Sequence, residues 1–150
     1  MVARRPYAQR ERAYIVDFVR TKYPYDLCYF NFRLGGLPAQ AEGFDIGDLS
    51  SNIWKVFNRY VDALVVQSDR LILLEAKILA DLGAVSQLEY YSSLVKTTPE
   101  LAQYLQLPVE LHIVTASGDP AFIAFAQAKN IIVDIYRTQT AVDYLKQLLK

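Results

Sequence analysis

The chain has 150 residues, of which 53% are hydrophobic and 21% are charged, and this composition is typical of a folded globular protein and excludes a disordered chain. Sixteen basic and sixteen acidic side chains give a net charge of zero, so nothing in the total charge attracts a polyanion, and such a partner must bind a local patch. One cysteine and one histidine exclude an internal disulfide and a histidine-rich zinc site.

The length of the chain indicates how many domains it forms, and the length of its apolar segments indicates whether it can cross a membrane. We expect residues 1–150 to form a single domain, because the length suits one and no break in composition divides the chain. The N-terminal stretch MVARRPYAQRER is polar and basic with no apolar run behind it, and the apolar segments are much shorter than the ~20 residues that cross a bilayer. We therefore expect no membrane role and a cytoplasmic protein.

The hydrophobic pattern predicts a helix at 7–21 and an alternating aromatic strand at 26–34 that ends at a Gly-Gly pair. The segment 38–58 is harder to assign, although its SSNIWKVF stretch is compatible with a short helix capped by Ser50 or Ser51. The remaining pattern predicts, in chain order, strands at 59–67 and 70–79, helices at 84–95 and 99–105, a strand at 109–115, a helix at 120–129, a strand at 131–136 and a helix at 140–149.

This order of elements predicts an α/β fold. Three strands in succession followed by βαβ-like crossovers imply a mixed central sheet with helices on both of its faces. The terminal helix at 140–149 is apolar on one side and is either part of the core or the interface of a homodimer.

Three charged side chains interrupt the apolar stretch RYVDALVVQSDRLILLEAKI at residues 59–78, namely Asp62, Glu75 and Lys77. If residues 68 and 69 form a two-residue turn, residue 67 faces 70 and, by the same count, Asp62 faces Glu75. Their Cβ atoms then lie about 4.5 to 5.5 Å apart on one face of the sheet, and Lys77 points to that face because strand side chains alternate. A loop with an odd number of residues would instead send the two acids to different faces.

Two carboxylates among Leu, Val and Ile need a compensating interaction, because burying unpaired charge is costly. Oxygen ligands on two strands suit Mg²⁺ or Mn²⁺, and such a metal beside a lysine supplies the parts of a phosphodiester hydrolase. The alternative is structural: charges near a strand end reach solvent, and Lys77 is an ordinary ion-pair partner of Glu75. On the following helix Gln87 and Tyr91 stand four residues apart, so they share a face that can reach back over the sheet.

Together these residues resemble the PD-(D/E)xK nuclease superfamily, and particularly its RecB-like branch with a Q-x-x-x-Y motif. The resemblance rests on Asp62, on E-A-K at 75–77 and on Q-L-E-Y-Y at 87–91, placed on a strand, a strand and a helix. It covers about residues 7–117 and implies a restriction-endonuclease-like fold with an α-β-β-β-α-β core and a C-terminal βα extension. One departure is that Val61, and not proline, precedes Asp62.

The resemblance implies a Mg²⁺-dependent deoxyribonuclease, with Mn²⁺ as a substitute metal. Asp62 and Glu75 would bind the metal, and the carbonyl oxygen of Ala76 would be a further ligand. Members of the superfamily often add a glutamate from the first helix. Glu11 lies on the helix face that carries the apolar stripe, so it is either that ligand or a surface glutamate.

The resemblance also assigns roles around the metal. Lys77 would serve the attacking water, and Gln87 and Tyr91 would contact or orient the nucleic-acid strand. The catalytic residues implied in this way are Asp62, Glu75, Lys77 and Gln87.

Other polar residues allow more than one interpretation. Arg10 and Arg12 belong to the basic cluster at the start of the first helix, which is either a phosphate-binding arm or a solvated helix start. Asp45 and Asp48 are loop acids that can approach the metal. His112 lies within a predicted strand with no second histidine nearby, so we expect a core or edge histidine and not a metal ligand.

Two functions therefore compete. The first is a metal-dependent DNA phosphodiester hydrolase in which water attacks in line. The second is a catalytically inactive protein of the same fold that acts as a structural or DNA-contacting component of a larger assembly, such as a phage particle or a mobile-element complex, and is then virion-associated. The small size and zero net charge favour the second function, and the retention of costly charges at the motif positions favours the first.

Overall fold

A computed structural model describes residues 6–36 and 59–150, with side chains described from Gln9 onward in the first segment. The undecided segment 38–58 and its possible SSNIWKVF helix lie outside the described residues, as do Asp45 and Asp48. Within the two described ranges no helix is both long and apolar enough to span a membrane.

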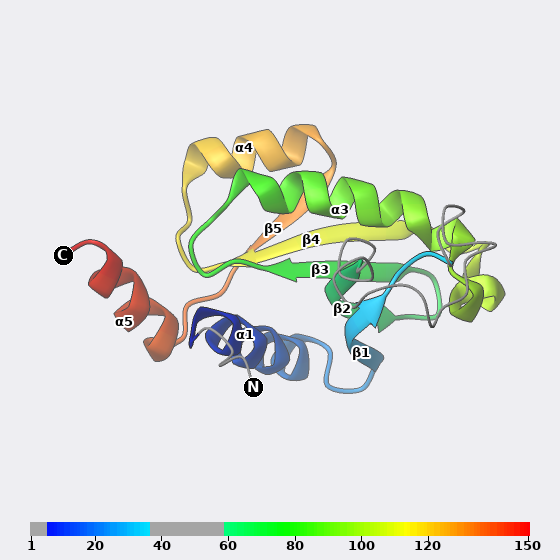
Figure 1. The fold of residues 1–150 in the computed structure, drawn as a ribbon, viewed down its shortest axis with the longest axis horizontal. Helices are drawn as coiled ribbons and strands as arrows, with labels where there is room; N and C mark the ends of the chain where they lie inside the picture. The colour runs from blue at the N-terminus through cyan, green and yellow to red at the C-terminus, as the bar shows by residue number, and fades with distance from the viewer. Residues whose placement is uncertain (1–5, 37–58) are drawn as a thin grey trace, which may run out of the picture.

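Five strands form one mixed sheet in the order β1-β2-β3-β4-β5 (Figure 1). The pairs β1–β2 and β2–β3 are antiparallel, and the pairs β3–β4 and β4–β5 are parallel. The strands are β1 (Leu27–Arg33), β2 (Tyr60–Val66), β3 (Leu71–Ala76), β4 (Val109–Thr115) and β5 (Ile131–Ile135).

Helices cover both faces of this sheet, and Figure 1 shows α3 and α4 on one side and α1 and α5 on the other. Side chains of Asp81, Asp119 and Thr138 accept hydrogen bonds from backbone N–H groups at the starts of α3, α4 and α5, as N-caps do. The helices are α1 (Pro6–Lys22), α3 (Leu82–Leu94), α4 (Pro120–Ala128) and α5 (Gln139–Leu148), with 3₁₀ turns η3 (Val95–Thr97) and η4 (Pro99–Tyr104). The predicted order of helices and strands is confirmed.

One predicted boundary was wrong. The strand expected at 70–79 ends at Ala76, because the chain must turn out of the sheet before Asp81 caps α3. Residues 77 and 78 still run beside β4: the N–H of Lys77 donates to Val114 O at 2.9 Å, and that of Ala116 donates to Ile78 O at 3.1 Å.

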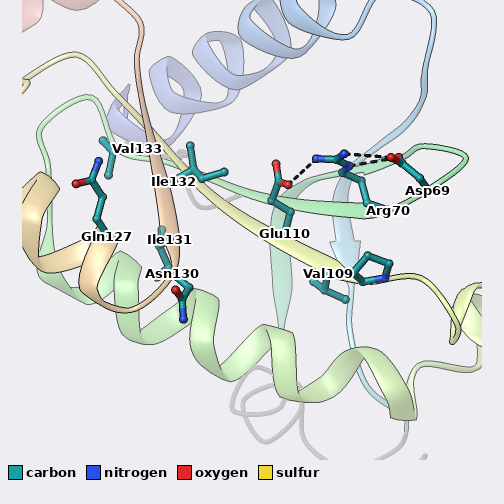
Figure 2. A pocket seen from close by; sticks show the side chains of 10 residues that line it. Asp69, Arg70, Val109, Glu110, Gln127, Asn130, Ile131, Ile132 and Val133 are labelled. Carbon is teal, nitrogen blue, oxygen red and sulfur yellow. Dashed lines mark hydrogen bonds and ion pairs between the residues drawn. The ribbon is translucent and has the colours of Figure 1, made fainter.

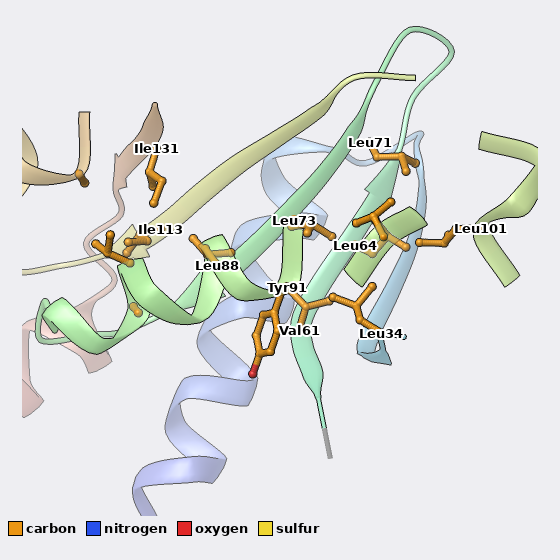
Figure 3. Packing of buried hydrophobic residues seen from close by; sticks show 14 of the residues in the cluster. Leu34, Val61, Leu64, Leu71, Leu73, Leu88, Tyr91, Leu101, Ile113 and Ile131 are labelled. Atoms are coloured by element: carbon orange, nitrogen blue, oxygen red, sulfur yellow. The ribbon is translucent and has the colours of Figure 1, made fainter. Parts of the chain in front are cut away.

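Two hydrophobic clusters lie on opposite faces of the sheet. The α3-side cluster joins the sheet to α3 and α4, and Figure 3 shows Tyr91 and Val61 within it. The α1-side cluster includes Tyr14, Ile15, Phe18, Ala63, Ile72 and Leu74. Every residue of β3 is buried, which explains its unbroken apolar sequence: this central strand is covered on both faces.

In both β1 and β2 the alternation of side chains between the two sheet faces is interrupted next to Asp62, the charged residue of β2. Phe30 packs against the α1-side cluster and Phe32 against the α3-side cluster, although residues two apart on a regular strand share a face. The same switch separates their partners Ala63 and Val61. Asn31, between the two phenylalanines, has φ 52°, a left-handed conformation that asparagine adopts more readily than most residues.

Asn31 offers a test of this switch. Replacing it with alanine should lower the free energy of unfolding by about 1–2 kcal/mol, because alanine pays the steric cost of the left-handed region, whereas glycine should be nearly neutral. Urea denaturation of the two variants beside the wild type measures both values. Equal stability of the alanine variant and the wild type would show that the strand does not need this conformation.

His112 is buried on β4 and joins a polar network. Its Nδ1 lies 2.6 Å from Asp134 Oδ2 and its Nε2 lies 2.6 Å from Glu110 Oε1, so both ring nitrogens donate only when the ring is protonated. Burial by itself would lower the pKa of His112, but the hydrogen bonds to Asp134 and Glu110 outweigh it and raise that pKa. The expectation of a core histidine is confirmed.

The raised pKa of His112 predicts a pH dependence of stability. A histidine whose pKa is higher in the folded than in the unfolded chain stabilises fully below the unfolded pKa, and the contribution disappears as pH rises through the folded pKa. His112→Gln should therefore lower the free energy of unfolding by about 1–3 kcal/mol at pH 6 and by clearly less at pH 9. Urea denaturation of both proteins at the two pH values gives this difference, and a pH-independent difference would contradict the charged network.

Candidate active site

The β2–β3 hairpin has the predicted register. The N–H of Gln67 donates to Arg70 O at 2.9 Å around the two-residue turn, and the strand pairs run from Val66 with Leu71 to Ala63 with Leu74. One further step places Asp62 opposite Glu75, as the count from residues 68 and 69 predicted. The alternative loop of odd length is excluded.

Side chains replace the backbone ladder at this end of the hairpin. Glu75 Oε1 accepts a hydrogen bond from the Asp62 N–H at 3.1 Å, and Asp62 Oδ2 accepts one from the Ala76 N–H at 2.9 Å. Each acid thus binds the backbone of the opposite strand, so the two carboxyl groups are held side by side. Each also has a second oxygen that these two bonds leave unused.

Both acids are held in surroundings that disfavour their charge. Glu75 is 4% exposed, and its burial and the neighbouring Asp62 charge raise its pKa far above its usual range. Burial likewise raises the pKa of Asp62, although its hydrogen bonds to Ala76 and Glu75 and the charge of Lys77 oppose that shift. At neutral pH the pair therefore favours a shared proton or a bound cation over two bare charges.

Lys77 and Glu11 complete a small cluster around the pair. Lys77 Nζ lies 3.9 Å from Glu11 Oε2, and the two side chains are only 20% and 12% exposed. This contact replaces the ordinary Lys77–Glu75 ion pair that the structural alternative assumed. A cavity of about 360 Å³ opens beside the cluster, and its walls include Glu11, Arg12, Asn31 and Asp62.

The two motif residues of α3 differ in their positions. Tyr91 is 9% exposed and packs in the α3-side cluster, and burial followed by the charges of Glu75 and Asp62 raises its pKa to about 12, so its ring lies near both acids. Gln87 is exposed one helical turn earlier, and within the described part of the chain its side chain makes no hydrogen bond to Asp62, Glu75 or Lys77.

The two arginines of the predicted basic arm also separate. Arg12 is exposed and lines the 360 Å³ cavity, so it faces the space next to Asp62. The Cζ atom of Arg10 lies 4.8 Å from the centroid of the Tyr144 ring, so it contributes to the packing of α1 against α5. The other two basic residues of this N-terminal cluster, Arg4 and Arg5, lie outside the described residues.

Among the residues that the structure describes, no three His, Cys, Asp or Glu side chains form a group able to enclose a metal ion. The donors that do converge are the carboxyl groups of Asp62 and Glu75. Such a set suits Mg²⁺, which usually keeps several waters and is held by only one or two carboxylates.

A larger cavity, of about 620 Å³, lies at the turn end of the hairpin (Figure 2). Its carboxylates, Asp69 and Glu110, both bind Arg70, at 3.0 and 2.8 Å. Arg70 precedes Glu75 by five residues of an extended strand, roughly 16 Å. This cavity is therefore separate from the paired acids.

The folded chain is similar to the crystal structure of a repair endonuclease from Pyrococcus abyssi, with a TM-score of 0.52 and 15% sequence identity. The fold is restriction-endonuclease-like. This confirms the predicted fold class, and at such low identity the likeness extends to the fold alone. The match covers 91% of this chain and 50% of the endonuclease chain, so this chain corresponds to about half of that protein. No protein-family model and no curated protein matches the sequence.

The structure adds Asn31 to the residues that sequence reasoning had placed at the site. Asn31 lies between the residues of β1 that pair with Val61 and Ala63, and hence opposite Asp62, and it lines the same cavity. The face switch at this position accompanies the break in the strand ladder beside Asp62. The sequence signal was an asparagine between two phenylalanines in a mainly apolar strand.

Proposed function

We propose that the protein is a metal-dependent DNA phosphodiester hydrolase of the PD-(D/E)xK superfamily, in its RecB-like branch. The observation that carries this proposal is the Asp62–Glu75 pair: the two carboxyl groups lie side by side, Glu75 buried and Asp62 half-buried, and the charge of Lys77 acts on both. The nuclease-like fold supports it. DNA as the substrate comes from the resemblance of the motif residues.

The residues present fit a divalent metal ion. Asp62 and Glu75 share surroundings in which a proton or a cation is needed to offset their charge, and each keeps an oxygen that the backbone bonds do not use. Asp62 and Glu75 would hold Mg²⁺ or Mn²⁺, with the Ala76 carbonyl and Glu11 as further candidates. A bound metal would polarise a phosphoryl oxygen and lower the pKa of a bound water.

The other residues of the site have separate roles in this proposal. Lys77 places an ammonium group beside the attacking water and offsets negative charge that develops in the transition state. Glu11 orients that ammonium through its 3.9 Å contact. Tyr91 supports the acids from the α3 side, Gln87 contacts the substrate strand, and Arg12 binds a phosphate at the mouth of the cavity.

Incubating the purified protein with DNA tests this function. With Mg²⁺ or Mn²⁺ it should nick or degrade at least one of four substrates, linear duplex, circular, single-stranded or branched DNA, and EDTA should stop the reaction. Asp62→Asn should be inactive under the same conditions. Absence of cleavage of all four substrates with either metal would contradict a deoxyribonuclease.

A catalytically inactive, DNA-contacting component of a larger assembly, such as a phage particle, is the second candidate. It is favoured by the zero net charge of the chain, which provides no general attraction for DNA. Calorimetry with Mn²⁺ distinguishes the two functions, because a site that has lost its catalytic role should bind no metal. The location of the protein, in the cytoplasm or in a virion, stays a prediction, and so does the formation of a homodimer.

A further inference from the structure

Arg59, which directly precedes β2, is held in place from three sides. Its carbonyl oxygen accepts a hydrogen bond from the Leu34 N–H at 2.8 Å. Its Nη1 packs against Gly35, where an added Cβ would lie only 3.2 Å away. Its Cζ lies 5.8 Å from the centroid of the Tyr90 ring, in a cation–π contact.

The guanidinium of Arg59 has no carboxylate partner among the residues that the structure describes. Arg70 and Lys129, by contrast, are paired with acids: Arg70 with Asp69 and Glu110, and Lys129 with Glu89. An arginine that is oriented by an aromatic ring and by backbone, but not neutralised, keeps its planar donor face for an external anion.

Arg59 is connected to the paired acids along β2 and through two tyrosine rings. It precedes Asp62 by three residues, so the Cα atoms of the two residues are at most about 10 Å apart. The Tyr90 ring beneath it is 49% exposed, and its centroid lies 6.3 Å from that of Tyr91, whose ionisation is affected by Glu75 and Asp62. Arg12, by contrast, lines the cavity beside Asp62 from α1.

We propose that Arg59 binds a backbone phosphate of the substrate strand on the α3 side of the acids, and that Tyr90 positions its guanidinium. This inference rests on the proposed function and names two residues that the motif resemblance does not include. Because the Cα atoms of Arg59 and Asp62 are at most about 10 Å apart, the phosphate bound by Arg59 would lie within a few nucleotides of the one at the acids. The strand would therefore run from Arg12 across Asp62 and Glu75 to Arg59.

The test is fluorescence anisotropy of labelled DNA in EDTA, where no metal-dependent cleavage occurs, over a series of KCl concentrations. Arg59→Gln should weaken binding by about tenfold at 0.1 M salt and reduce the slope of log Kd against log salt by about one, as expected for one lost phosphate contact. Arg59→Lys should restore the slope. Tyr90→Leu should weaken binding with the slope unchanged, because the charge stays but is no longer positioned.

Lys129→Gln is the matched control, because Lys129 also lies over an exposed aromatic ring, 5.7 Å from the centroid of Phe125. It contacts Glu89 of α3 from the start of the turn after α4, and its loss should change neither Kd nor slope. Thermal unfolding of each variant confirms that it is folded.

The outcomes separate the inference from the proposed function. If the wild type cleaves DNA and Arg59→Gln binds with an unchanged Kd and slope, the inference is overturned and the proposed function stands. If Arg59→Gln weakens binding as expected but no metal supports cleavage, the phosphate contact stands and the hydrolase does not. If the wild type binds none of the four kinds of DNA and cleaves none of them with either metal, both are overturned.

Discussion

Lys77→Ala should lower the single-turnover rate of DNA cleavage by about 10²- to 10³-fold, the usual effect of removing one group that stabilises charge in the transition state. Lys77 is mostly buried next to Glu11, and its charge reduces the pKa values of both Asp62 and Glu75. Its removal takes away the cation beside the reacting phosphate and leaves the strand hydrogen bonds of the hairpin intact. Cleavage is followed by gel electrophoresis with enzyme in excess and saturating Mg²⁺.

Two controls make this result specific. Lys146→Ala removes an exposed lysine from α5 and should leave the rate unchanged, and both alanine variants should unfold cooperatively with midpoints close to that of the wild type. A Lys77→Ala protein that is folded and cuts at the wild-type rate would exclude the proposed role of Lys77.

Glu75→Gln should make the metal-free protein more stable and should also abolish metal binding. The pKa of Glu75 is raised by burial and by Asp62, so the folded chain binds a proton more tightly than the unfolded chain does. The free energy of unfolding therefore falls as pH rises from the unfolded pKa of Glu75 towards its folded pKa. Glutamine keeps an oxygen for the Asp62 N–H and removes the charge, which should stabilise the fold by about 1–3 kcal/mol at pH 8 and by much less at pH 4.5.

A bound metal ion should make the wild type more stable than Glu75→Gln. Wild-type protein should gain about 2.7 kcal/mol when free Mn²⁺ reaches 100 times its Kd, whereas Glu75→Gln should gain little. Urea denaturation at pH 4.5 and 8, with and without MnCl₂, measures both effects, and calorimetry measures the binding itself.

Glu110→Gln is a control that should change the free energy of unfolding in the opposite direction. The pKa of Glu110 is lowered, mainly by its hydrogen bond to His112 and also by Arg70, so its charge stabilises the fold and its loss should destabilise the protein at pH 8. If Glu75→Gln were also destabilising at pH 8, the acids of the hairpin would be compensated within the protein, and the argument for a bound cation would fail.

The local pattern was sufficient to predict the main framework of the site. A two-residue polar turn between apolar strands determines which residues face each other, because each step along one strand is matched by one step along the other. Asp62 and Glu75 were thereby predicted to be neighbours, and the register of β2 and β3 in the structure agrees. Helical spacing and capping residues in the same way predicted the order of the helices and strands.

The environment of these acids depended on parts of the chain that are distant in sequence. Glu11 contacts Lys77 only because α1 packs across the sheet. Arg10 contacts the Tyr144 ring because α5 lies on the same side of the sheet as α1. Arg59 and Tyr90 meet through the packing of α3 beside β2. Such contacts join different helices and strands and depend on how their side chains pack. The spacing of residues within one helix or strand therefore does not predict them.

The sequence by itself determined the mixed α/β fold, the hairpin register and the pairing of Asp62 with Glu75, because these follow from periodicity and from one short turn. Only the tertiary structure decided the face switch at Asn31, the burial that raises the pKa of Glu75, and the position of the Arg59 guanidinium against the Tyr90 ring. These features depend on how the two layers of helices close over the sheet, since solvent exclusion and charge pairing are properties of the packed chain.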